Sequence, residues 1–119
     1  MKKFYHLSTC NTCQRIFNEL QLSAAFEKRD IKQQEITVKE LEGMKQLAGS
    51  YEALFSKRAK LYKERDLKNE ILTENDYKSF ILEHYTFLKR PVLIDGDTIF
   101  IGNSKKVVET AKERLAKKK

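Results

Sequence analysis

The sequence predicts an α/β domain in which helices flank a small mixed sheet. A short apolar run at residues 4–7 is followed by apolar residues that recur at helical spacing, which indicates a strand and then a helix. Apolar runs at 92–94 and 99–101 flank Asp95-Gly96-Asp97, a strong signal for a β-hairpin. A strand–helix–strand beginning favours a parallel pair, and the hairpin adds antiparallel strands.

The N-terminal part contains the first helix, which we expect to begin just after Cys10. Asn11 and Gln14 have the spacing of a capping box. A second, weaker strand signal covers residues 25–31. The residues expected on the buried face of the first helix are Cys13, Ile16, Phe17 and Leu20.

The middle of the chain is predicted to be helical. Thr37 with Glu40, and Thr73 with Asp76, have capping-box spacing, and Gly49 is placed to end the first of these helices. Residues 51–68 predict only short helices and loops. The expected inner face of the helix after Thr73 is Tyr77, Phe80, Ile81 and Tyr85, and that of a final helix after Asn103-Ser104 is Val107, Val108, Ala111 and Leu115.

The composition limits the class of protein. A chain of 119 residues, 40% hydrophobic, has the size and apolar content of one domain. It lacks the run of ~18 apolar residues that a membrane helix needs, and its N-terminus lacks the pattern of a secretory signal. We therefore expect a cytoplasmic protein that does not bind membranes.

The charge and cysteine counts exclude other classes. Two cysteines are too few for a disulfide framework, and His6 and His84 lack ligand spacing to them, so no metal site is expected. The net charge is +7, with much of it in residues 105–119. Because no aromatic residues are interleaved there, we interpret this segment as a solvated helix face and expect no direct nucleic-acid binding.

The motif Cys10-Asn11-Thr12-Cys13 carries the chemistry. A Cys-x-x-Cys pair between a strand and a helix is typical of a redox site. The unpaired N–H groups and positive dipole end of a helix N-terminus stabilise a thiolate. Cys10, nearest the helix start, is the expected nucleophile, and Cys13, one turn further, is the expected resolving thiol. The alternative is that Cys13 is only a small apolar core residue.

Two further features carry little signal by themselves. Pro91 precedes an apolar strand, where a trans proline is common, because only about one X–Pro bond in twenty is cis. Arg90 and Arg58, taken alone, fit ordinary surface arginines.

Several segments, in this order and spacing, together resemble the ArsC/Spx family of thioredoxin-fold proteins. This family contains arsenate reductases and the regulator Spx. The matching segments cover residues 9–15, 29–31, 56–62, 88–95 and 101–102, so the resemblance extends over essentially the whole chain.

The resemblance implies a thioredoxin-like fold with a four-stranded mixed sheet, in one domain over residues 1–119. It implies a helical insertion between strands two and three, at approximately 37–88. It also implies that Pro91 is a cis-proline facing the cysteine loop, with Arg90 near the Cys10 thiolate or a bound anion. Arg58 would be a second cation there, and Asn11 and Thr12 would shape the loop.

The chain departs from the arsenate reductases of this family. Those enzymes hold their oxyanion with three arginines around one cysteine and have serine where this chain has Cys13. Arg90 matches one of the three arginines; the first falls at Ser56 or Arg58, depending on the alignment, and the third falls at Asn103. Because a desolvated arsenate dianion needs several charge-assisted hydrogen bonds, we do not expect efficient arsenate reduction.

Two functions remain open at this point. The first is an ArsC-like thiol–disulfide oxidoreductase that acts on a small thiol, an oxyanion or a protein disulfide. It would bind no cofactor and would take electrons from glutathione or another thiol reductant. The second is a redox-sensing transcriptional regulator like Spx, which binds the α-subunit of RNA polymerase.

Overall fold

The computed structural model describes residues 2–117, so the last two lysines of the basic C-terminal segment lie outside the described residues. The chain forms two compact units. The sheet unit comprises residues 2–34 and 90–117, and the helical unit comprises Glu35–Lys89. The helical unit nearly coincides with the insertion expected at 37–88. That the two units fold as one domain stays a prediction.

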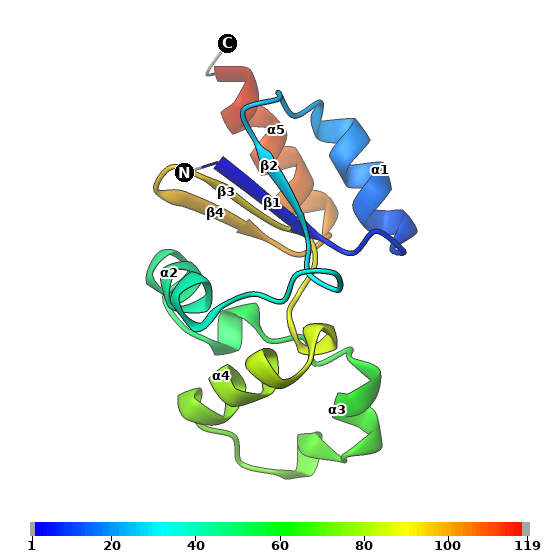
Figure 1. Ribbon diagram of the computed structural model, residues 1–119, viewed down its shortest axis with the longest axis vertical. Helices are drawn as coiled ribbons and strands as arrows, with labels where there is room; N and C mark the ends of the chain where they lie inside the picture. Colours follow the sequence, from blue (N-terminus) through cyan, green and yellow to red (C-terminus); the bar gives the residue numbers. More distant parts are fainter. Residues whose placement is uncertain (1, 118–119) are drawn as a thin grey trace. The chain divides into compact units, whose positions relative to one another are not determined.

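The sheet unit contains a four-stranded sheet of order β2-β1-β3-β4 (Figure 1). Its strands are β1 (Lys2–His6), β2 (Glu27–Asp30), β3 (Val92–Asp95) and β4 (Thr98–Ile101). β1 pairs with β2 in parallel and with β3 antiparallel, and β3 pairs antiparallel with β4. The predicted mixed sheet is therefore confirmed. Asp95 pairs with Thr98 across a two-residue turn in which Gly96 has a φ of 66°.

Two helices, α1 (Asn11–Leu20) and α5 (Lys105–Lys117), cover the same face of the sheet (Figure 1). Apolar residues from both helices and the two central strands are withdrawn from water together, which stabilises the layer. They are Phe4, Ile16, Leu20, Leu93, Val108 and Ala111. The N-terminus of α1 follows directly after the loop that leaves β1.

The start of α1 just after Cys10 is confirmed, but the expected capping box of Asn11 and Gln14 is wrong. Asn11 is already the first helical residue. The capping position belongs to Cys10, whose backbone is extended (φ −93°, ψ 109°) and whose sulfur takes the place of a capping oxygen. At the other end of the unit, Ser104 caps α5 by accepting the Val107 N–H.

The helical unit contains α2 (Val38–Ala48), η1 (Glu52–Leu54), α3 (Lys60–Glu64), η2 (Leu67–Asn69), α4 (Glu74–Glu83) and η3 (Tyr85–Phe87). Both predicted capping boxes, Thr37 with Glu40 and Thr73 with Asp76, are confirmed. Gly49 ends α2 in the left-handed conformation, with a φ of 95°. Tyr85 was expected on α4 and is not, because the backbone becomes extended at His84 and a separate 3₁₀ turn follows.

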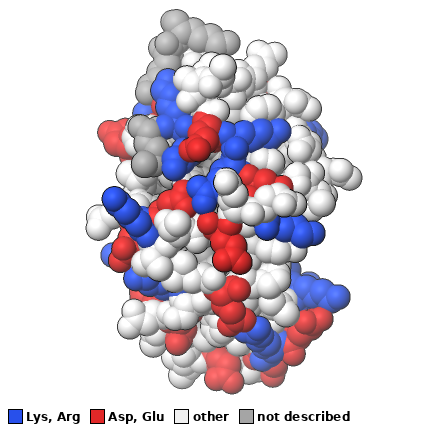
Figure 2. All heavy atoms as spheres, in the orientation of Figure 1, with Lys and Arg blue, Asp and Glu red and all other residues white. Residues whose placement is uncertain are grey.

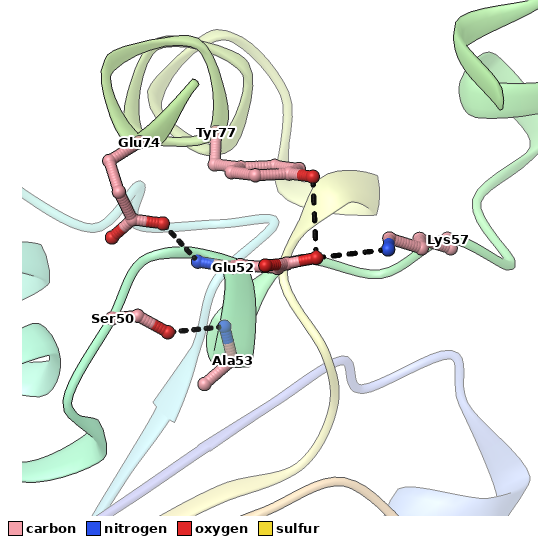
Figure 3. Close-up of polar contacts among 6 residues, drawn as sticks. All are labelled: Ser50, Glu52, Ala53, Lys57, Glu74 and Tyr77. Atoms are coloured by element: carbon pink, nitrogen blue, oxygen red, sulfur yellow. Dashed lines mark hydrogen bonds and ion pairs between the residues drawn. The ribbon is translucent and has the colours of Figure 1, made fainter. Parts of the chain in front are cut away.

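A polar network ties η1 to α4 within the helical unit (Figure 3). One Glu74 oxygen accepts the Tyr51 N–H at 2.7 Å, and the other accepts the Glu52 N–H at 3.1 Å. The Glu52 carboxylate in turn accepts hydrogen bonds from Lys57 and from the Tyr77 hydroxyl. Glu74 therefore caps the first turn of η1 from another helix.

The surface carries charges of both signs. Figure 2 shows Lys and Arg side chains interspersed with Asp and Glu side chains on the face drawn. Within residues 2–117, no helix is long and apolar enough to cross a membrane.

Candidate active site

The predicted site lies in the loop between β1 and α1. β1 ends at His6, and the backbone turns back within four residues, so that the Cys10 N–H donates to the Leu7 carbonyl at 3.0 Å. The fourth residue of this turn is also the cap of α1. The turn therefore fixes the Cys10 sulfur at the end of the helix.

The Cys10 sulfur accepts a hydrogen bond from the backbone N–H of Cys13 at 3.4 Å. The Cys10 carbonyl accepts the Gln14 N–H at 3.2 Å, as the first bond of the helix. Cys10 is half-buried and is a free thiol. An accessible sulfur that faces unpaired N–H groups is well placed to act as a thiolate nucleophile.

Cys13 lies in a different environment. Its side chain is 1% exposed. The pKa of the Cys13 thiol is raised to about 11, mainly by burial and also by hydrogen bonding to the Cys10 side chain. A backbone hydrogen bond with Leu7 and the charge of Arg90 act in the opposite direction. Cys13 therefore keeps its proton at neutral pH.

Arg90 and Pro91 enter the site from the segment that leads into β3. The peptide bond between them is cis, and the Pro91 carbonyl accepts the Gly102 N–H at 2.9 Å. The Arg90 charge acts to lower the pKa of the Cys13 thiol. The buried Nε and Nη1 of Arg90 find no hydrogen-bond partner among the described residues. Buried guanidinium donors normally have partners, so a thiolate or a bound anion would satisfy them.

The remaining predicted site residues divide between the two units. Asn11 is the exposed first residue of α1, and Thr12 beside it is half-buried. Arg58 belongs to the helical unit, where it is exposed on the turn before α3. Every predicted site residue except Arg58 thus belongs to the sheet unit. The roles of these residues, and that of Arg58, stay predictions.

Asp30, the last residue of β2, was not among the predicted site residues. Its carboxylate accepts hydrogen bonds from the side chain and backbone of Ser8, in the cysteine loop, and from the Lys32 N–H at 3.0 Å. These hydrogen bonds lower the pKa of Asp30, and the bond from the Ser8 hydroxyl contributes most. A signal existed: the carboxyl ends of parallel strands meet at one sheet edge, so a polar residue ending β2 should lie beside the loop after β1.

No metal centre accompanies the thiols in the part of the chain that the structure describes. Residues 2–117 contain no group of three or more His, Cys, Asp or Glu side chains that could hold a metal ion.

Comparison with known proteins identifies the family. The model of the ArsC family matches residues 5–111, which is most of the chain and includes the cysteine loop, Arg90 and Pro91. This chain belongs to the ArsC family. The ArsC-family chain is also 27% identical to "Global transcriptional regulator Spx 2" from Bacillus anthracis, over 86% of its own length and 79% of that protein.

Solved structures share the fold of this ArsC-family chain. A protein described as related to the ArsC family, from Bacteroides fragilis, has a TM-score of 0.76 at 22% identity, covering 92% of this chain and 96% of that one. An arsenate reductase from Vibrio cholerae has a TM-score of 0.75 at 19% identity, covering 94% and 95% of the two chains. The expected thioredoxin-like α/β fold is therefore confirmed.

Proposed function

We propose that this ArsC-family chain is a thiol–disulfide oxidoreductase of the cytoplasm, with Cys10 as the nucleophile and Cys13 as the resolving thiol. The observation that carries the proposal is the asymmetry of the pair. The Cys10 sulfur caps α1 and is partly accessible, whereas Cys13, one turn along, is buried and protonated at neutral pH. One sulfur is arranged to attack first and the other to attack second.

The reaction proceeds in two exchanges. The Cys10 thiolate attacks one sulfur of a substrate disulfide, an S–S bond forms between them, and the other substrate sulfur leaves as a thiolate. Cys13 then loses its proton to that leaving thiolate or to water and attacks Cys10. The second substrate thiol departs and the Cys10–Cys13 disulfide remains. The substrate gains two electrons. Two molecules of an external thiol such as glutathione then return the pair to its reduced form and leave joined as a disulfide.

The substrate class includes small disulfides, protein disulfides and oxyanions. Arg90 supports an anionic group at the site, because two of its buried nitrogens have no partner among the described residues. Arsenate is a poor candidate. A desolvated dianion needs several charge-assisted hydrogen bonds. Of the three positions where arsenate reductases of the family place arginine, one falls at Asn103 and another at Ser56 or Arg58, depending on the alignment.

A second candidate function is redox-controlled binding of the RNA polymerase α-subunit. The similarity to the regulator Spx 2 favours it, and the same thiol pair would then act as a switch instead of a catalyst. The two candidates differ in turnover, because a switch changes state once for each oxidant molecule whereas an enzyme cycles.

The test is a coupled assay with glutathione as reductant and hydroxyethyl disulfide as substrate, alongside a pull-down of the purified polymerase α-subunit. Cys13→Ser should stop turnover and accumulate a mixed disulfide on Cys10, whereas Cys10→Ser should accumulate none. Absence of turnover in the wild-type protein, together with oxidation-dependent capture of the α-subunit, would favour the regulator.

A further inference from the structure

Asp30 connects the sheet edge to the cysteine loop. It stands opposite His6 in the parallel pairing of β1 and β2, so both residues lie where their strands end. The Ile31 N–H donates to the His6 carbonyl at 2.9 Å, continuing the ladder one step beyond β2. The base of the cysteine loop and the end of β2 are therefore held together by the backbone.

The Asp30 carboxylate adds a second attachment, further into the loop. It accepts both the hydroxyl and the backbone N–H of Ser8, the second residue of the turn that ends at Cys10. The carboxylate itself is held by the Lys32 N–H at 3.0 Å, and the Asp30 carbonyl accepts the N–H groups of Gln33 and Gln34. Backbone N–H groups of the following residues thus hold both the carboxylate and the carbonyl of Asp30 in place.

Ser8 lies inside the turn that ends at Cys10, two residues before it. The turn closes by a single backbone hydrogen bond, from the Cys10 N–H to the Leu7 carbonyl. With Ser8 held, the backbone of Cys10 keeps the extended conformation that points its sulfur at the Cys13 N–H. Ser8 and Thr9 are exposed, so with Ser8 released we expect this loop to be less restrained and the sulfur to be able to leave the helix end.

We propose that Asp30 is a positioning residue for the nucleophile: by holding Ser8, it keeps the Cys10 sulfur at the N-terminus of α1. This inference rests on the proposed function, because Asp30 would position Cys10 for its role as the attacking thiolate. Asp30 touches no reacting atom in this role and acts only through the loop.

The experiment compares the rate at which iodoacetamide alkylates Cys10 at neutral pH in reduced protein, by peptide mapping. Asp30→Ala removes the acceptor and the charge, whereas Asp30→Asn removes the charge and keeps an acceptor oxygen. Glu27→Ala is the matched control, because it deletes a carboxylate from the other end of the same strand, where Glu27 forms an ion pair with Lys3 at 3.5 Å. All three variants change the net charge equally.

We expect Asp30→Ala to label about threefold to tenfold more slowly than Glu27→Ala, which corresponds to one or two lost hydrogen bonds. Asp30→Asn should stay within about twofold of wild type, because its oxygen still accepts from Ser8. Equal rates for Asp30→Ala and Asp30→Asn, or for Asp30→Ala and Glu27→Ala, would overturn the proposal. The first result would mean that the acceptor oxygen of residue 30 does not matter for the labelling rate. The second would mean that losing Asp30 matters no more than losing another carboxylate of β2.

Ser8→Ala keeps the test decisive if Asp30→Ala does not fold. It deletes only the hydroxyl, and we expect labelling about twofold slower; a rate equal to wild type would overturn the proposal. Alkylation requires no turnover, so these rates remain readable even if the wild-type protein reduces no disulfide. Failure of the proposed function would appear in the coupled assay instead.

Discussion

The sulfur of Cys10 accepts the backbone N–H of Cys13 at 3.4 Å, so one cysteine of the motif caps the helix that carries the other. This relationship makes the two thiols unequal. Cys10 faces the helix N-terminus from outside, whereas Cys13 lies inside the first turn and is buried.

Cys10 should alkylate faster than Cys13 at neutral pH, by at least about tenfold. Cys13 is 1% exposed, and burial raises its pKa to about 11, so little of it is thiolate under these conditions. Brief iodoacetamide treatment followed by peptide mapping measures both rates. Faster labelling of Cys13 would reverse the two assignments.

Arg90→Ala should slow the alkylation of Cys10 at neutral pH by about tenfold, because a fixed positive charge near a thiolate stabilises it. Lys89→Ala is the control, since Lys89 is the neighbouring cation and is exposed. Equal shifts for Arg90→Ala and Lys89→Ala would reduce Arg90 to part of a general basic surface.

The stability of the protein should fall as pH decreases below neutrality, in part through His6. Burial, and next the charge of Lys28, lower the pKa of His6 below its ordinary value of 6.5, while Asp30 opposes them. The unfolded chain therefore binds the proton first, and stability present at pH 7 is lost as pH falls through 6.5 toward the folded pKa. Chemical denaturation of wild type and His6→Gln between pH 7.5 and about 5.5 measures this. An unchanged slope in His6→Gln would contradict it.

Glu74→Ala should lower the free energy of unfolding by about 1–2 kcal/mol, because it leaves the N–H groups of Tyr51 and Glu52 without their acceptor. Urea denaturation measures the change. Glu70→Ala is the control: this exposed glutamate lies in the same unit and, in the described contacts, its side chain holds no backbone group. A loss as small as that of Glu70→Ala would show that water replaces the carboxylate at no cost.

Local signals predicted several elements in both units. The hairpin around Gly96, the helix start after Cys10 and the capping boxes at Thr37 and Thr73 all depend on residues within a few positions of one another. Such signals act in the chain segment itself and survive tertiary packing.

The features that were predicted wrongly or not at all also have physical explanations. β2 was expected over residues 25–31 but covers Glu27–Asp30, because an edge strand extends only as far as its partner β1 pairs with it. The capping role of the Cys10 sulfur was overlooked because sulfur is seldom a capping acceptor. Asp30 was missed because its bonds to Ser8 join residues 22 positions apart, which no local pattern records.

The most direct test of the central claim is the product of mild oxidation. We expect diamide to convert the reduced protein into a monomer that has lost two hydrogens, with Cys10 and Cys13 linked in one peptide, because the two sulfurs lie one helical turn apart. Cys13→Ser should abolish this product. Intermolecular dimers joined through Cys10 as the main product would contradict the claim and leave Cys13 as an apolar residue of the core.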